Sequence, residues 1–309
     1  MKGIVFGPVA SRRLGKSLGV NIVSKKICSL DCLYCEVCKT NTLTLKRAPY
    51  IPVEKILAEF SAKYPLVKNK TDVITITGMG EPTLNSHLKE IIAGIKELSE
   101  HPVALLTNST LLSDSNVAEA LMQLDIIVPS LDAVTQDIFE IVDKPAPGLK
   151  INEIIKSLIS FSCKFSGKLY LEILLVKGIN DSPAELLRLA EMAKQIRHTK
   201  IQICTVFRPP AWEGAERLSE SEIKEICMFF SKQGLNVEFA GAFNVHASKN
   251  VTPEIKKQLL ESLLCIRPVT VQDISEGIGI SAEEAELLIA SIDSVQIQNY
   301  NGEIYYCIR

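Results

Sequence analysis

The sequence predicts an α/β protein with a partial (β/α)6 TIM-type barrel and a small α+β domain toward the C-terminal end. Three observations support this fold class. From Ile51 to Lys232, β-rich runs alternate with amphipathic runs of helical period, which indicates parallel strands joined by helices. With one strand that precedes the cysteines, six strands are found, fewer than the eight of a closed barrel. From about Val251 the alternation gives way to three helical patterns and a hairpin pattern.

The elements of the barrel follow one another in a regular order. A short strand pattern ends near Ile22, before a cysteine-rich loop. Five more strands are predicted over residues 71–77, 103–107, 125–128, 169–176 and 200–206. Helices are predicted over residues 52–60 and 86–98, from about 113, and over 136–142, 151–161, 183–196 and 220–232. The unusual residues of the sequence lie in the loops after the strands, the edge at which such barrels carry their chemistry.

Composition limits the class of protein. With 309 residues, 47% of them hydrophobic and 23% charged, the chain can bury a large core and form one large domain with a smaller one. The apolar runs are strand-sized, well short of the roughly 20 residues of a membrane span. A net charge of −2 gives no general attraction to nucleic acid or anionic lipid. Because the first residues lack the order of a secretory signal, we expect a cytoplasmic protein without a membrane partner.

Four of the nine cysteines lie between residues 28 and 38. Cys28, Cys32 and Cys35 are separated by three and then two residues, and a short loop can turn three such thiolates toward one point. Three thiolates leave one iron of a four-iron cluster open to another ligand, as a catalytic metal requires. Structural zinc and a disulfide framework are the alternatives. Zinc more often uses separated Cys-x2-Cys pairs, and disulfides need an oxidising compartment.

The pattern Cys28-x3-Cys32-x-Tyr34-Cys35 resembles the signature of the radical S-adenosylmethionine (SAM) superfamily. The segment from Gly7 to Cys35 is similar to the subgroup related to the wyosine-base tRNA enzymes. This resemblance implies a [4Fe-4S] cluster held by the three cysteines, with SAM on the open iron and Tyr34 beside the adenine. It also implies reductive cleavage of SAM to methionine and a 5′-deoxyadenosyl radical. An electron donor of the flavodoxin or ferredoxin type is then a partner.

Loops after two of the later strands resemble further motifs of the family. The run Gly78-Met79-Gly80-Glu81-Pro82 resembles the Gly-Gly-Glu-Pro loop that binds the SAM amino group, with Gly80, Glu81 and Pro82 aligned. Glycines let a backbone approach a ligand closely, and a carboxylate accepts from an ammonium group. Asn108 and Ser109 match the Thr-Asn-Gly turn of the family, with serine in place of the glycine.

Other charged and polar residues near the ends of strands complete the expected site. Ser130 and Asp132 match a turn that, by resemblance, contacts the SAM carboxylate or ribose. Capping the next helix is the alternative for this pair and for the pair Asn108 and Ser109. Glu172 lies in an apolar strand and is expected to face SAM or substrate. Arg208 follows the sixth strand, where it can pair with a carboxylate or phosphate. The expected cofactor-binding residues are Tyr34, Gly78, Gly80, Glu81, Pro82, Asn108, Ser109, Ser130, Asp132, Glu172 and Arg208.

Two features of the sequence are each open to more than one interpretation. Arg12, Arg13 and Lys16 either form an anion site near the cluster or are solvated loop charges. Cys38 is a spare thiol, a ligand of a second cluster or a thiol on the substrate side. The wyosine enzymes take a second cluster from cysteines upstream of the signature, and this chain has no cysteine before Cys28.

The last residues predict a separate domain, residues 251–309, after a radical SAM barrel over residues 1–245. Helices over residues 253–264, 270–278 and 281–291, a turn at Gly277 and Gly279, and a hairpin around Asn301-Gly302 resemble a winged helix. Four lysines and arginines against nine acidic residues give this region a net charge of −5, the wrong sign for binding phosphates. A contact with protein, or presentation of the substrate, is therefore favoured over DNA binding.

These observations favour radical modification of a protein, a peptide or a small metabolite. Modification of a tRNA or other RNA base follows from the subgroup resemblance, although the near-neutral charge and the absence of upstream cysteines weaken it. A non-enzymatic iron–sulfur transcriptional sensor is a further alternative, but it has no use for the loops at Gly80 and Asn108. The substrate is not predicted, because its contacts lie in loops that vary on one scaffold.

Overall fold

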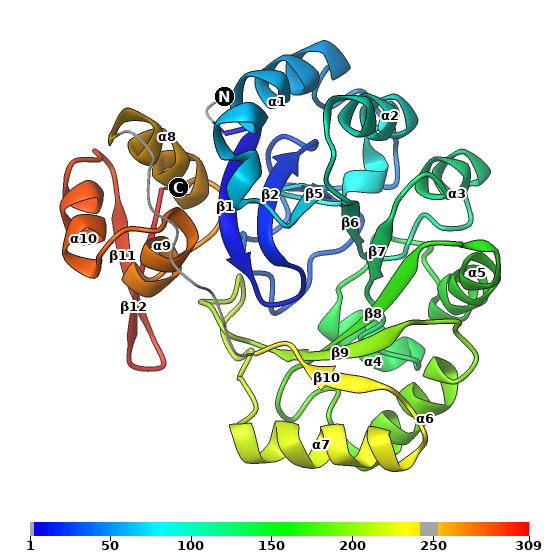
Figure 1. Cartoon of the computed structure of the whole chain (residues 1–309). Helices are drawn as coiled ribbons and strands as arrows, with labels where there is room; N and C mark the ends of the chain where they lie inside the picture. Colours follow the sequence, from blue (N-terminus) through cyan, green and yellow to red (C-terminus); the bar gives the residue numbers. More distant parts are fainter. Residues whose placement is uncertain (1–2, 242–252, 309) are drawn as a thin grey trace.

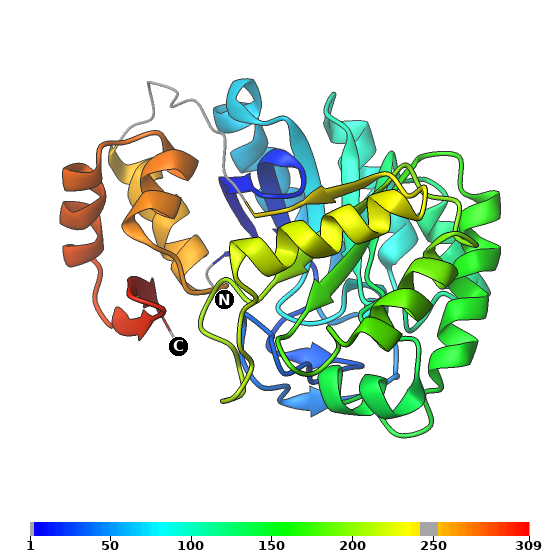
Figure 2. The same cartoon turned by 90° about the horizontal axis from the view of Figure 1, so that it is seen from below.

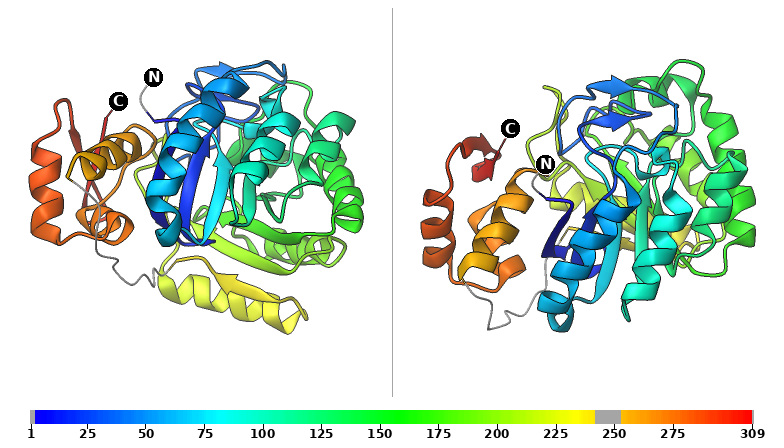
Figure 3. Two further views of the ribbon diagram at one scale, coloured as in Figure 1. Left: turned by 45° about the horizontal axis from the view of Figure 1, so that its top comes forward. Right: turned by 90° about the horizontal axis from the view of Figure 1, so that it is seen from above.

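We analysed a computed structural model, which describes residues 3–241 and 253–308 (Figure 1). The predicted division between residues 245 and 251 lies outside the described residues. The larger part of the structure is a curved sheet with helices on its outer side, and a smaller unit packs against one edge of the sheet (Figures 1 and 3).

The eight-stranded sheet has the order β1-β2-β5-β6-β7-β8-β9-β10. Strand β1 is antiparallel to β2, and every other neighbouring pair is parallel. The strands are β1 (Val5–Ser11), β2 (Gly15–Asn21), β5 (Val73–Thr77), β6 (Val103–Thr107), β7 (Ile126–Pro129), β8 (Lys168–Leu175), β9 (Lys200–Thr205) and β10 (Val237–Phe239). The α/β class and the partial barrel are confirmed, and β2 and β5 to β9 are the six predicted strands.

The strands at the two edges, β1 and β10, were not predicted. Gly7 and Pro8 interrupt the pattern of β1, and its pairing register with β2 shifts between Phe6 and Val9. A side chain on Gly19 would overlap the ring of Phe6, so this glycine lets the ring pack closely against β2. Strand β10 is too short to give a periodic signal.

The helices form the outer layer of the barrel, which Figure 2 shows from below. They are α1 (Val53–Val67), α2 (Leu88–Leu98), α3 (Ser115–Leu121), α4 (Gln136–Val142), α5 (Ile151–Lys164), α6 (Pro183–Ala193) and α7 (Glu220–Lys232). Helix α1 runs beyond its predicted end at Phe60. Its buried residues Ile56, Phe60, Tyr64 and Val67 continue one helical face through Pro65.

The small unit contains α8 (Pro253–Leu264), α9 (Val271–Ile278), α10 (Ala282–Ala290) and the antiparallel pair β11 (Gln296–Tyr300) and β12 (Glu303–Cys307). This α+β composition is confirmed. Thr270 and Asp273 form a capping box at the start of α9, and Gly279 ends the helix with a φ of 76°. Gly277, predicted in the turn, instead lies inside α9. Helices α8 and α9 pack on β1, which makes β1 the joint between the two parts.

Two further features concern the described chain as a whole. No helix among the described residues is long and apolar enough to cross a bilayer. Of the cysteines outside the cysteine loop, Cys204 and Cys307 are buried, whereas Cys163 is exposed because it lies on the solvent side of α5.

Candidate active site

The cysteine loop follows β2 and is fixed from two sides. The amide of Leu33 donates to the carbonyl of Val142 at the end of α4 (2.9 Å), and the amide of Ala211, after β9, donates to the carbonyl of Cys35 (2.9 Å). Within the loop, the amide of Cys35 donates to the carbonyl of Cys32 (3.2 Å). Backbone contacts to both halves of the barrel therefore hold the three thiols at the carboxyl ends of the strands.

Polar groups surround the thiols of this loop. Among the described residues, no two cysteines form a disulfide. Lys26, whose side chain is buried, donates from Nζ to Sγ of Cys35 (2.9 Å). Burial raises the pKa of Cys28 to about 11 and raises that of Cys32 well above its usual range. Burial acts to lower the pKa of Lys26, but the thiols of Cys35 and Cys28 outweigh it and raise that pKa. The lysine is thus a buried cation that stabilises thiolates.

The loop Gly78–Pro82 lies directly against the start of the cysteine loop. The amide of Glu81 donates to the carbonyl of Ile27, one residue before Cys28 (3.1 Å). A Cβ on Gly80 would overlap that same carbonyl, so only glycine permits the contact. Pro82 is buried and begins the short helix η2 (Pro82–Leu84). The loop Gly78–Pro82 and the cysteine loop are therefore in direct contact.

The carboxylate of Glu81 is fully occupied by donors of the protein. It is 2% exposed, and it accepts from the amide and hydroxyl of Thr83 (3.1 and 2.7 Å), the hydroxyl of Thr107 (2.7 Å) and the amide of Asn108 (2.8 Å). Burial raises the pKa of Glu81. The side chain expected to accept from SAM instead joins the ends of β5 and β6.

Asn108 reaches the cysteines themselves. Its Nδ2 donates to Oγ of Ser29 (2.9 Å) and lies 3.6 Å from Sγ of Cys28. Ser109 has a φ of 68°, the left-handed region that glycine prefers, which explains the family's glycine at the aligned position. Its hydroxyl donates to the carbonyl of Ser130 (2.8 Å). The turns after β6 and β7 are therefore linked behind the cysteine loop.

Tyr34 is held by two carboxyl groups. Its hydroxyl donates to Oδ2 of Asp132 in a short hydrogen bond and lies 3.4 Å from Oδ1 of Asp143. Asp132 also accepts from the amide of Leu174 (2.7 Å), and burial raises its pKa to about 6. Asp132 therefore orients the aromatic ring that was expected beside the adenine. The side chain of Asp132 does not cap a helix, which was the alternative interpretation.

Glu172 points into the barrel, as its position in β8 predicts, and there it forms an ion pair with Arg13. The thiol of Cys204, on β9, lies 3.7 Å from the same carboxylate. Arg13 belongs to the turn between β1 and β2, so this pair connects that turn to the opposite side of the sheet. The carboxylate is paired within the protein and needs no cofactor for its charge.

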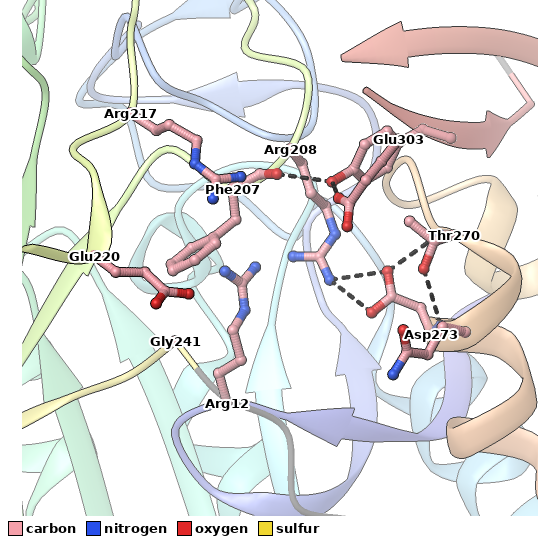
Figure 4. Close-up of a pocket in the computed structure, with 11 residues that line it drawn as sticks. Arg12, Phe207, Arg208, Arg217, Glu220, Gly241, Thr270, Asp273 and Glu303 are labelled. Carbon is pink, nitrogen blue, oxygen red and sulfur yellow. Dashed lines mark hydrogen bonds and ion pairs between the residues drawn. The ribbon is translucent and has the colours of Figure 1, made fainter. Parts of the chain in front are cut away.

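Arg208 is also paired within the protein. It is 2% exposed and donates from Nη1 to Glu36 (3.0 Å) and from Nη2 to both oxygens of Asp273 (3.2 and 3.3 Å). Figure 4 shows this arginine reaching across to the start of α9. The carboxylate partner expected for Arg208 is thus supplied by the cysteine loop and by the small C-terminal unit.

Several functional side chains escaped the sequence analysis because each lies outside a motif. Asp143 closes α4, and Glu36 is an ordinary acidic residue after Cys35. The only signal for Lys26 is a basic residue two positions before Cys28, and nothing in the sequence pairs the C-terminal unit with the cysteine loop. The missed residues are Lys26, Glu36, Asp143, Arg267 and Asp273.

The donors at this edge fit an iron–sulfur cluster with SAM beside it. Three thiols on one clamped loop are the ligands such a cluster uses. Lys26 and Asn108 direct N–H groups at the sulfurs of Cys35 and Cys28, which favours thiolates. The Gly80 loop touches the cysteine loop. Among the described residues, no group of three or more histidine, cysteine, aspartate or glutamate side chains lies close enough together to hold a single metal ion.

A family model described as the Radical SAM superfamily matches residues 22–190, more than half of the chain. The chain belongs to the radical SAM superfamily. It is therefore a radical SAM enzyme, and its cofactors are the [4Fe-4S] cluster and SAM that this superfamily uses. Enzymes of this kind require an external electron donor. The initial resemblance is confirmed at the level of the superfamily.

The chain is also similar to individual proteins and to solved structures. A UPF0026 protein of Helicobacter pylori strain J99 is 38% identical over 93% of this radical SAM chain and 88% of its own length. A protein named GTPase Obg from Brachyspira hyodysenteriae is 32% identical over 99% of the chain, which covers 45% of that longer protein. A solved radical SAM methyltransferase from Sphaerobacter thermophilus has a TM-score of 0.57 at 18% identity, covering 72% of this chain and 66% of its own, and so shares the fold.

Proposed function

We propose that Cys28, Cys32 and Cys35 hold the cluster and that this enzyme modifies a small metabolite or a peptide in the bore of the barrel. When bound, the cluster and SAM supply one-electron chemistry that gives methionine and a 5′-deoxyadenosyl radical, which takes a hydrogen atom from the substrate. The protein's part is to fix the thiols, to orient SAM and to exclude water.

The observation that carries the proposal is the direct contact between the Gly78–Pro82 loop and the cysteine loop. The amide of Glu81 and the missing side chain of Gly80 place the SAM-binding loop against Ile27, next to Cys28. Asn108 lies on the other side of the same thiol. We assign the backbone of residues 78–80 and the side chain of Asn108 to SAM. Tyr34, oriented by Asp132, is assigned to its adenine.

A compact substrate is favoured over RNA by charge and by space. A cavity of about 180 Å³ lies between the Gly78 loop and the C-terminal unit, and residues of both parts line it. Helix α10 carries Glu283 and Glu284 in its first turn, where a helix that binds nucleic acid would carry lysine or arginine side chains. We therefore propose that the winged-helix-like unit, residues 251–309, closes the barrel over the substrate.

RNA-base modification is the second candidate, supported by the likeness of the segment from Gly7 to Cys35 to the wyosine subgroup. A partial barrel leaves its side open, where a large substrate can enter. The absence of cysteines before Cys28 opposes a second cluster of the wyosine type. We place the enzyme in the cytoplasm, where an oxygen-sensitive cluster survives best, with a flavodoxin or ferredoxin as electron donor.

Anaerobic reconstitution tests the proposal. The protein is loaded with iron and sulfide, reduced with dithionite and incubated with SAM, and 5′-deoxyadenosine is quantified by chromatography. We expect 5′-deoxyadenosine from the wild type and none from Cys28→Ala, with Cys163→Ala as the matched control because that cysteine is exposed on α5. Equal amounts from the wild type and Cys28→Ala would refute the assignment. Tight co-purification of tRNA would favour the second candidate.

A further inference from the structure

The C-terminal unit reaches the cysteine loop through a chain of ion pairs, in addition to the packing of α8 and α9 on β1. Asp273, in the first turn of α9, accepts from Nη2 of Arg208 with both carboxylate oxygens (3.2 and 3.3 Å). Nη1 of Arg208 donates to Glu36 (3.0 Å), the residue directly after Cys35. One guanidinium group, labelled in Figure 4 together with Asp273, therefore connects the C-terminal unit to the neighbour of a proposed cluster ligand.

Both carboxyl groups of this chain are ionised. Burial acts to raise the pKa of Asp273, but Arg208 and Arg267 outweigh it and lower that pKa. Burial also acts to raise the pKa of Glu36, and the neighbouring arginines, Arg208 foremost, outweigh it and lower that pKa. The side chain of Arg208 is 2% exposed. Its hydrogen bonds are therefore charge-assisted and shielded from water, which makes them a firm connection.

A second set of contacts runs through the segment after β9. The hydroxyl of Tyr305, on β12, lies 2.8 Å from the carbonyl of Phe207 and 2.6 Å from the carboxylate of Glu303. Tyr305 is buried. Four residues after Phe207, the amide of Ala211 donates to the carbonyl of Cys35 (2.9 Å). Strand β12 therefore contacts the same segment that clamps the cysteine loop.

The two sets of contacts meet at Cys35 and Glu36. One ends at the side chain of Glu36, and the other ends at the carbonyl of Cys35. They start from α9 and from β12, two different elements of the C-terminal unit. A segment held by its side chain and by its main chain has little freedom to turn. The thiol of Cys35, which accepts from Lys26, projects from this doubly held position.

Docking of the C-terminal unit does not by itself account for these contacts. Helices α8 and α9 already pack on β1, which joins the unit to the barrel. The cost of removing two charges from water offsets much of their attraction, so a buried ion pair adds little net stability to such packing. It fixes the relative position of the groups it joins, because only one geometry keeps both charges paired. Here the groups belong to α9 and to the cysteine loop.

We infer that the C-terminal unit positions the cluster ligand Cys35, and that Asp273 and Tyr305 are the positioning residues through which it acts. This function goes beyond closing the barrel over the substrate. It rests on the proposed function only in that Cys35 is taken as a cluster ligand. The geometry of the cluster then depends on whether the C-terminal unit is in place.

Hydrogen exchange of the full-length chain, followed by mass spectrometry before iron and sulfide are added, tests the inference. The reporters are peptides that cover the amides of residues 33–36. Asp273→Asn removes the charge but keeps an oxygen for the amide of Thr270 at the helix cap. We expect exchange about tenfold faster or more in this variant, and a smaller increase in Tyr305→Phe. Asp273→Glu should restore part of the protection.

Two variants and one helix are the controls. Asp293→Asn is exposed in the same unit, and Tyr306→Phe lies on the opposite face of β12 from Tyr305. Both should exchange as the wild type does. Helix α5 is the internal reference, because it lies on the other side of the barrel from the C-terminal unit (Figure 1). The inference is wrong if neither Asp273→Asn nor Tyr305→Phe accelerates exchange in residues 33–36 more than in α5.

The spectrum of the cluster separates this inference from the proposed function. In the reduced, cluster-loaded enzyme without SAM, Asp273→Asn should change the g-values or the line width of the electron paramagnetic resonance signal, and Asp293→Asn should not. A wild-type spectrum in Asp273→Asn would also refute the inference. If the wild type forms no cluster, the proposed function fails, while the exchange rates still decide whether the C-terminal unit holds Cys35.

Discussion

The ammonium group of Lys26 lies 2.9 Å from the sulfur of Cys35 and is shielded from solvent. A cation in this position stabilises negative charge on the sulfur. The reduced form of a cluster carries one more negative charge than the oxidised form, so the cation stabilises the reduced form more. Lys26 is therefore expected to raise the reduction potential of the cluster.

Replacing Lys26 by methionine should lower the cluster's midpoint potential. A hydrogen bond to a charged group contributes about 1.5 to 3 kcal/mol, which for one electron corresponds to roughly 60 to 130 mV. A potentiometric titration followed by electron paramagnetic resonance measures the shift. Lys25→Met is the matched control, since that neighbouring lysine is exposed. An unchanged potential in Lys26→Met would show that the amine does not act on the cluster.

Gly80 is expected to tolerate no side chain. In Gly80→Ala, the added methyl group would collide with the carbonyl of Ile27, so the Gly78–Pro82 loop must move away from the cysteine loop. We expect a loss of about 2 kcal/mol or more in the free energy of unfolding, together with weaker SAM binding. Urea unfolding and equilibrium dialysis with labelled SAM measure the two effects.

Gly277→Ala is the control for that substitution. Gly277 lies in α9, and a Cβ there would meet nothing closer than 3.4 Å. Alanine should be neutral or stabilise the helix by up to about 1 kcal/mol. If both alanine variants were equally stable, the close approach at Gly80 would not constrain the loop.

Glu81→Gln should destabilise the protein although it preserves the shape of the side chain. Four N–H and O–H groups donate to this carboxylate, and the amide nitrogen of glutamine would face at least one donor with another donor. A buried donor left unsatisfied costs about 1 to 3 kcal/mol. Glu90→Gln, exposed on α2, should change stability by less than about 0.5 kcal/mol. Thermal unfolding measures the loss of stability in each variant. A loss in Glu81→Gln no larger than that in Glu90→Gln would contradict the prediction.

Arg208→Met should loosen the C-terminal unit from the barrel. Loss of the guanidinium removes the arginine that pairs with Asp273 and one of the three arginines around Glu36, and breaking a buried ion pair costs about 3 to 5 kcal/mol. Lys89→Met removes an exposed ion pair to Glu119, which solvent screens, and should leave the stability close to that of the wild type. Similar losses in the two variants, measured by urea unfolding, would mean that the bridge does not hold the unit.

Local patterns in the sequence were enough to predict the central strands and the superfamily. Alternating periods placed the six central strands, and the spacing from Cys28 to Cys35 matched the signature of the superfamily to which the chain belongs. The glycine expected at Ser109 by resemblance is explained by the positive φ of that residue. Such features depend only on residues that are close together in the chain, so a single sequence is enough to predict them.

Contacts between distant segments were not predictable. Arg267 and Asp273 lie over 200 positions after Glu36, and nothing in the single sequence relates them. Glu81 and Arg208 were expected to bind SAM or a carboxylate or phosphate, but their partners in the structure are protein groups that only the folded chain brings close. Residues with a binding function in a motif and residues that support the motif look alike until the contacts are known.

The central claim is that Cys28, Cys32 and Cys35 hold a cluster whose open iron binds SAM. Electron paramagnetic resonance of the anaerobically loaded and reduced enzyme, recorded without and with SAM, tests it most directly. The account predicts a cluster signal whose g-values shift when SAM is added, retained in Cys163→Ala and absent in Cys28→Ala, Cys32→Ala and Cys35→Ala. A spectrum indifferent to SAM, or a cluster retained in those three variants, would contradict it.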